Sequence, residues 1–157
     1  MLRPLVIATV LLVAAVSAGC AGGSVSKQEF RQDVLSARNH ADAGLAQVVD
    51  ASSVEDLLAR MRIAAVEVRD AATDVRKAPA PDELEDEREQ LADRLLALSD
   101  EIVSTVETLE AFPEQAASTN ALNFAAWDAV QAALAKLRRE GIDVRPLARH
   151  TPQIERQ

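Results

Sequence analysis

The chain has 157 residues, and its 25 acidic and 17 basic side chains give a formal net charge of −8 at neutral pH. This balance argues against a nucleic-acid-binding protein, which needs a basic surface. Aromatic residues make up only 3% of the chain, so exposed aromatic platforms that stack on bases or sugars are not expected.

The N-terminus has the order of a secretory signal peptide. Arg3 supplies a positive charge, residues 5–16 are apolar apart from Thr9, and small residues follow. The apolar run is much shorter than the ~20 residues that a helix needs to span a bilayer. We therefore expect residues 1–19 to be a cleaved signal peptide and not a transmembrane anchor.

The only cysteine follows this run directly, in the sequence Ser17-Ala18-Gly19-Cys20. These residues resemble the lipobox of bacterial lipoproteins, with Ser17 where Leu is commoner. In that family a diacylglycerol is attached to the cysteine thiol and the chain is cut just before it. The resemblance covers about the first twenty residues, and it implies a lipid anchor at Cys20 on the extracytoplasmic face of the cell membrane. The alternative is an ordinary signal peptide that leaves a free thiol.

The mature chain is predicted to begin with a flexible tether, residues 20–26. The six small or polar residues after Cys20 reach about 20 Å at most, so the domain that follows is expected to lie close to the membrane. With no other cysteine in the chain, this domain has no disulfide bond.

Residues 27–142 are predicted to form the folded domain. Apolar residues recur there at steps of three and four along four segments, as on the buried face of amphipathic helices. The segments are residues 27–50, 53–77, 81–112 and 118–140. Short connections between such helices, and the lack of any strand pattern, favour an all-α fold, an antiparallel up-down four-helix bundle.

Two of these helices have candidate caps at their starts. Ser52 with Glu55 three residues later predicts a capping box for the second helix. Ser118, Thr119 or Asn120 is a candidate cap for the fourth.

Proline and glycine mark other boundaries. Pro81 suits the first position of the third helix. Gly141 followed by Ile142 predicts a Schellman ending of the fourth helix. Residues 143–157 contain prolines and scattered charge, and we expect an irregular, exposed C-terminal tail.

Motifs for chemistry are scarce. The two histidines, His40 and His150, do not stand three residues after a glutamate, as they do in the metal sites of helical bundles. There is no Gly-x-Ser-x-Gly turn and no glycine-rich phosphate loop. We therefore expect no catalytic residue, no metal and no cofactor, with His40 partly exposed on the first helix and Trp127 packed between helices.

The strongest polar feature is the acidic run at residues 82–89. Asp82, Glu85, Asp86 and Glu89 recur at steps of three and four, so a helix places them on one face. The simpler interpretation is a solvated helix start whose carboxylates complement the helix dipole. The alternative is a weak patch for a divalent cation or a basic partner. A straight helix cannot surround a calcium ion with six to eight oxygens, so tight calcium binding is not expected.

Arg88 and Thr105 interrupt the heptad pattern of the third segment. These residues are the candidates for a polar pocket, if the domain binds a small ligand or cation. The preferred function is a lipid-anchored, non-enzymatic interaction or structural module of the bacterial cell envelope, with an envelope protein as its partner. The alternative is an envelope binding protein for a small ligand or divalent cation.

Overall fold

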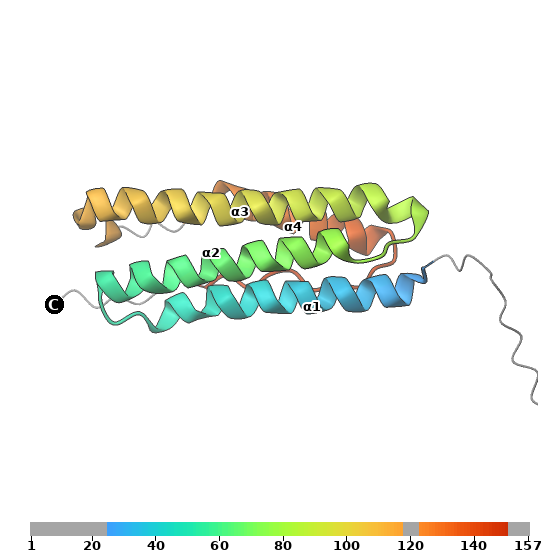
Figure 1. Cartoon of the computed structure of the whole chain (residues 1–157), viewed down its shortest axis with the longest axis horizontal. Helices are drawn as coiled ribbons and strands as arrows, with labels where there is room; N and C mark the ends of the chain where they lie inside the picture. Colours follow the sequence, from blue (N-terminus) through green and yellow to red (C-terminus); the bar gives the residue numbers. More distant parts are fainter. Residues whose placement is uncertain (1–24, 118–122, 151–157) are drawn as a thin grey trace, which may run out of the picture.

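The computed structural model describes residues 25–117 and 123–150. The predicted signal peptide and the lipidation site at Cys20 lie outside these residues, as do residues 118–122 and 151–157. Within the described ranges all regular secondary structure is helical, and Figure 1 shows the four α-helices. They are α1 (Lys27–Ala46), α2 (Val54–Lys77), α3 (Glu85–Ala111) and α4 (Ala125–Arg139). The predicted all-α class and the four-helix bundle are confirmed.

Three short 3-10 segments lie between the α-helices in the described ranges: η1 (Gln47–Asp50), η2 (Asp82–Leu84) and η3 (Pro113–Ala117). Pro81 therefore precedes η2 and is not the first residue of α3, which begins at Glu85. The fourth helix begins at Ala125, later than predicted, and its candidate caps Ser118, Thr119 and Asn120 lie outside the described residues.

The start of α2 corrects the predicted capping box by one residue. Ser53 is the N-cap, and its hydroxyl accepts a hydrogen bond from the Asp56 backbone N–H at 3.1 Å. Asp56 in turn accepts hydrogen bonds from the backbone N–H and the hydroxyl of Ser52. Ser52 and Asp56 thus complete the cap, while Glu55 is exposed.

The predicted ending of α4 is confirmed. Gly141 has a φ of 88°, in the left-handed region that favours glycine. The Ile142 N–H donates to the Leu137 carbonyl at 3.0 Å and the Gly141 N–H to the Arg138 carbonyl at 3.1 Å. These are the two bonds of a Schellman motif, and Ile142 is buried behind them.

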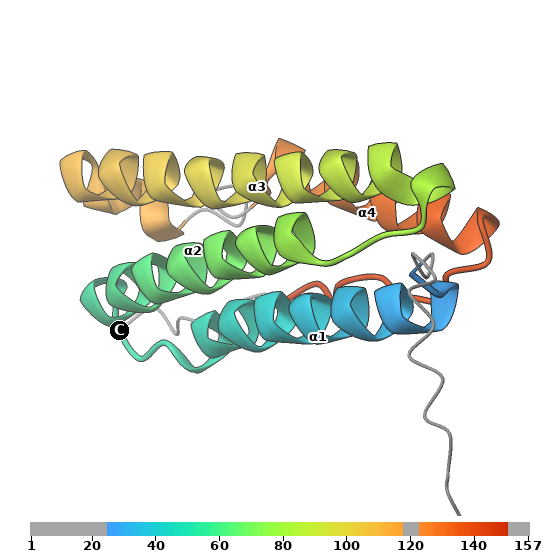
Figure 2. The same cartoon turned by 45° about the vertical axis from the view of Figure 1, so that its right-hand side comes forward.

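Each helix packs antiparallel against the one before it in the chain, as Figures 1 and 2 show. In contrast, α1 and α4 have little direct contact. The chain after Gly141 runs back alongside α1, in the space between α1 and α4 (Figure 2). We call this extended segment, residues 142–150, the C-terminal strap.

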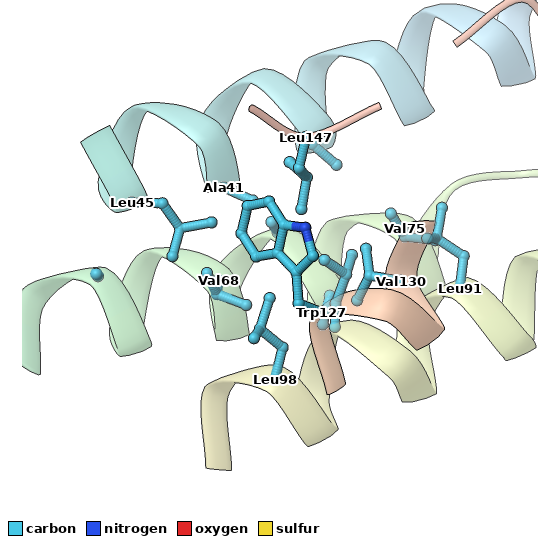
Figure 3. Packing of buried hydrophobic residues seen from close by; sticks show 14 of the residues in the cluster. Ala41, Leu45, Val68, Val75, Leu91, Leu98, Trp127, Val130 and Leu147 are labelled. Atoms are coloured by element: carbon cyan, nitrogen blue, oxygen red, sulfur yellow. The ribbon is translucent and has the colours of Figure 1, made fainter. Parts of the chain in front are cut away.

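The core is built from the apolar faces of all four helices and from the strap. Figure 3 shows the ring of Trp127 on α4 surrounded by side chains of α1, α2 and α3 and by Leu147 of the strap. Trp127 packs between helices, as predicted, with 8% of its surface exposed. Each large apolar side chain buried in this way stabilises the fold by roughly 1.5–3 kcal/mol before entropy is counted.

Candidate functional site

The predicted acidic face lies at the start of the third helix. Asp82 is in η2, and Glu85, Asp86 and Glu89 lie in the first turns of α3. Asp82, Glu85 and Asp86 are exposed, and none of them forms an ion pair with another described residue. Glu89 is half-buried, and its carboxylate lies 3.5 Å from the guanidinium of Arg76 on α2. Three of the four carboxylates are therefore open to solvent, and the fourth is paired within the bundle.

The other two acids of the run bind neighbouring helices. The carboxylate of Glu83 lies 3.8 Å from the ammonium of Lys27 on α1. Glu87 lies 3.1 Å from the ammonium of Lys136 on α4, and the hydrogen bond from this ammonium lowers the pKa of Glu87 below its usual value. The acidic run thus links three helices at one end of the bundle.

The geometry of the acids does not form a metal cage. Among the residues that the structure describes, no three His, Cys, Asp or Glu side chains are grouped so that they could hold one ion. The exposed carboxylates project from a straight helix, which leaves any cation above them mostly hydrated.

The polar breaks in the seam of α3 are not brought together. Arg88 and Thr105 lie about 25 Å apart along the helix axis. The guanidinium of Arg88 donates to the Ala78 carbonyl at 3.4 Å and to the Glu89 carboxylate at 2.9 Å. Thr105 donates to the Glu101 carbonyl one turn earlier, at 2.8 Å. Each side chain is half-buried, and each is held by its own local contacts.

A small cavity lies elsewhere, between the helices and the strap. Its volume is about 10 Å³, and its lining is apolar apart from Arg38. One water molecule needs about this much space, so this cavity is far too small for an organic ligand. Neither Arg88 nor Thr105 lines it.

The two histidines contact carboxylates between elements. His40 is exposed on α1, as predicted, and its Nε2 contacts the carboxylate of Glu67 on α2, with Asp74 3.9 Å from its Nδ1. His150 is at the end of the strap, and its Nε2 lies 3.3 Å from the Asp42 carboxylate on α1. Both pairs connect segments that are distant in sequence.

The strap is the feature that sequence reasoning missed. We expected an exposed tail from residue 143 onward, but Val144 and Leu147 are buried in the core, along with Ile142 just before them. The signal was available in the spacing of these three apolar residues within a segment without helical periodicity.

Side chains of α1 and α4 hold the backbone of the strap. On α1, Arg31 donates to the Asp143 carbonyl at 3.1 Å, and Arg38 donates to the Pro146 carbonyl, with its Nε at 3.2 Å. On α4, the side-chain amide of Gln131 donates to the Leu147 carbonyl at 2.9 Å. The Asp42 carboxylate on α1 accepts a hydrogen bond from the Ala148 N–H at 2.8 Å. Four side chains from two helices thus recognise one extended main chain.

Comparisons with known proteins gave no match: no family model, no curated protein and no solved structure is similar to this chain. In the described ranges no helix combines the length and the apolar character that crossing a membrane requires.

Proposed function

We propose that this protein is a lipid-anchored, non-enzymatic interaction or structural module of the bacterial cell envelope, located on the extracytoplasmic face of the cell membrane. The observation that carries the proposal is the position of the only cysteine. Cys20 follows a short apolar run and the small residues Ala18 and Gly19. A diacylated cysteine gives stable anchoring, whereas a single acyl chain gives only reversible binding.

The position of α1 supports a bundle held close to the membrane. The helix begins at Lys27, and the six residues between Cys20 and Lys27 span about 20 Å at most. The Lys27 ammonium donates to the Glu140 carbonyl at 3.1 Å, and it lies 3.8 Å from the Glu83 carboxylate. The start of α1, the acidic run and the end of α4 therefore share the anchored end of the bundle.

The charge of this end affects how the domain stands on the membrane. Asp82, Glu85 and Asp86 are exposed there without a partner among the described residues. Carboxylates are repelled by anionic lipid headgroups, and the repulsion extends over about one Debye length, ~8 Å at physiological ionic strength. The lipid anchor would hold the domain near the surface, while the acidic end keeps it from lying on the bilayer.

The interior supports a role in macromolecular contact more than one in small-molecule chemistry. Apolar side chains fill the core of the described residues. The buried hydroxyl of Ser99 donates a hydrogen bond to the Ala65 carbonyl at 2.8 Å. Charged groups lie on the surface instead. A surface of this kind offers contacts to a partner, whereas ligand sites need a concave pocket.

The anchoring proposal is tested by Cys20→Ser in the full-length chain. We expect the variant to be released from the membrane fraction or to accumulate as a larger, uncleaved precursor. In the matched control the cysteine is moved, as Cys20→Ser combined with Ser24→Cys, and the displaced thiol is expected not to restore anchoring. Fractionation and intact-mass measurement report the result. A membrane-bound Cys20→Ser product of mature size would contradict the proposal.

A further inference from the structure

The strap fills a groove that α1 and α4 leave between them. Val34 on α1 and Val130 and Leu134 on α4 line the same small cavity as Leu147 of the strap. Val144 is completely buried, and Leu147 is 4% exposed. Without the strap these apolar side chains would face water, so the groove requires an occupant.

The groove recognises its occupant mainly through the main chain. Arg31, Arg38 and Gln131 donate to strap carbonyls, and Asp42 accepts from a strap N–H. Main-chain hydrogen bonds combined with pockets for spaced apolar side chains are a general mode of binding extended peptides. The same contacts can form whichever copy of the chain supplies the strap.

The connection between α4 and the strap can act as a hinge. Gly141 joins them at a φ of 88°, and no heavy atom lies within 4 Å of the position that a Cβ would occupy there. The strap follows the last helix, so it can leave the groove without any helix being threaded or unfolded. Only the Schellman bonds and the strap contacts have to open.

We propose that two copies of this protein exchange straps, so that the strap of each copy occupies the α1–α4 groove of the other. Such an exchange gives a two-fold dimer with the same contacts as the closed monomer, which is a low-cost route to association. A second copy is the occupant that the groove fits, because its strap carries the same backbone path and the same Val144 and Leu147. In one chain the strap has a high effective concentration at its own groove, so exchange needs crowded copies.

This inference rests on the proposed function in that the partner is a second copy of this protein. A lipid anchor shared by all copies would crowd them on one membrane surface. The test of the inference is independent of the anchor, because it uses chains in which Cys20→Ser removes the native thiol. Failure of strap exchange would leave the anchoring experiment unaffected, and failure of anchoring would leave the exchange experiment unaffected.

The test mixes two single-cysteine variants of the full chain. Asp128 on α4 and Arg149 on the strap are 81% and 67% exposed, and their charged groups lie 3.5 Å apart. One copy carries Asp128→Cys and the other Arg149→Cys, and the mixture is treated at high concentration with a thiol-to-thiol crosslinker whose spacer is about as long as the arginine side chain that is removed. Strap exchange places the two thiols within reach of this spacer in different chains. We expect several-fold more crosslinked heterodimer than in the control mixture, in which exposed Ser104 on α3 is changed to cysteine in place of Asp128.

A single chain with both Asp128→Cys and Arg149→Cys verifies the geometry, because the crosslinker should join its thiols within the chain at low concentration. Heterodimer above the Ser104→Cys control supports strap exchange. Efficient closure within the chain, with no heterodimer above the control at any concentration, overturns it. A light-scattering mass of the unmodified Cys20→Ser chain that stays monomeric at millimolar concentration would overturn it as well.

Discussion

Glu101 on α3 caps the N-terminus of α4, a helix that is distant from it in sequence. The N-cap position of α4 is Phe124, which has no side-chain acceptor for the free N–H groups of the first turn. Glu101 on α3 supplies both acceptors: its carboxylate oxygens lie 2.8 Å from the Ala125 nitrogen and 2.7 Å from the Ala126 nitrogen. The negative charge also complements the positive end of the helix dipole.

Glu101→Ala is therefore expected to lower the free energy of unfolding by about 1–2 kcal/mol, the usual cost of losing an N-cap. Glu107→Ala, at an exposed position on the same helix, is the matched control and should change the free energy by less than about 0.5 kcal/mol. Urea unfolding followed by the fluorescence of Trp127 measures both. Equal effects of the two substitutions would show that Glu101 does not cap α4.

The capping carboxylates also predict how stability depends on pH. Ser26 is the N-cap of α1, and hydrogen bonds from its backbone N–H and its hydroxyl lower the pKa of Glu29 from its ordinary value of 4.5. The Ser52 backbone N–H, followed by the Arg60 side chain, lowers the pKa of Asp56 from its ordinary value of 3.8. A pKa that is lower in the folded state means that the unfolded chain binds protons first as the pH falls.

The stability from these two caps should thus be fully present above about pH 4.5 and be lost as the pH falls through the lowered values of the folded state. Thermal unfolding between pH 5 and pH 2 measures this loss. Asp56→Asn cannot titrate, so the variant should show a shallower decline of Tm over this range than the unchanged chain. A decline of the same steepness would mean that other carboxylates cause the acid sensitivity.

At the scale of elements, a row of ion pairs sets the register between α2 and α3. Three arginines of α2 recur every seven residues and pair with acids of α3 in the reverse order. The pairs are Arg62 with Glu110, Arg69 with Asp100 at 2.8 Å, and Arg76 with Asp93 at 2.5 Å. These side chains are about half exposed, and each exposed pair adds at most about 1 kcal/mol. Their regular spacing favours one antiparallel register over its shifted alternatives.

The contact between α1 and α2 depends on a glycine. A Cβ at Gly44 would lie 2.5 Å from the Cβ of Glu67, too close for two carbon atoms. Alanine is normally about 1 kcal/mol better than glycine inside a helix. Here the clash opposes that gain, because overpacking costs roughly 1–3 kcal/mol. The glycine thus permits a close approach that an ordinary helix residue would prevent.

Gly44→Ala should therefore destabilise the domain by about 1 kcal/mol or more, against the normal helix preference. In a Glu67→Gly background the same substitution should instead stabilise by up to about 1 kcal/mol, because the Cβ that causes the clash is gone. Denaturant unfolding of the four chains gives the coupling between the two positions. A stabilising Gly44→Ala in the unchanged background would rule out the close approach.

Most of the helices could be predicted from sequence because their apolar periodicity is local. The start of α1 and the bounds of α2 follow from this pattern, whereas α1 ends at Ala46 and not at residue 50, because Gln47–Asp50 form η1. The pattern does not choose between Ser52 and Ser53 as the cap of α2, since the two are adjacent and each precedes an acid by three residues. The start of α4 could not be predicted in the same way, since its acceptor, Glu101, lies on another helix. Three of the four residues of the predicted acidic face lie on α3 and Asp82 lies in η2, and the ion pairs of the acidic run depend on how the helices pack.

At the scale of the whole molecule, the bundle is closed by a segment without regular secondary structure. With little direct contact between α1 and α4, the core would be open along one side. The strap closes it with Ile142, Val144 and Leu147, which are all buried. The spacing of these apolar residues indicates burial but not which groove they fill, because the strap packs only after four helices have formed that groove.

The contribution of the strap is tested by Leu147→Ala. Leu147 lies against the ring of Trp127 (Figure 3), so its truncation leaves a cavity beside the only tryptophan. Deleting a buried leucine side chain costs about 2–5 kcal/mol, a large fraction of the roughly 5–15 kcal/mol of a typical domain. We expect a loss in this range, with a changed Trp127 emission before unfolding begins.

Arg145→Ala is the control within the strap, because Arg145 is exposed and its truncation should change the free energy of unfolding by less than about 0.5 kcal/mol. Hydrogen exchange adds a second measurement: in Leu147→Ala the Ala148 N–H, which donates to Asp42 at 2.8 Å, should exchange faster than in the unchanged chain. If Leu147→Ala cost no more than Arg145→Ala and left this exchange rate unchanged, the strap would be a passive tail, and α1 and α4 would hold the bundle closed without it.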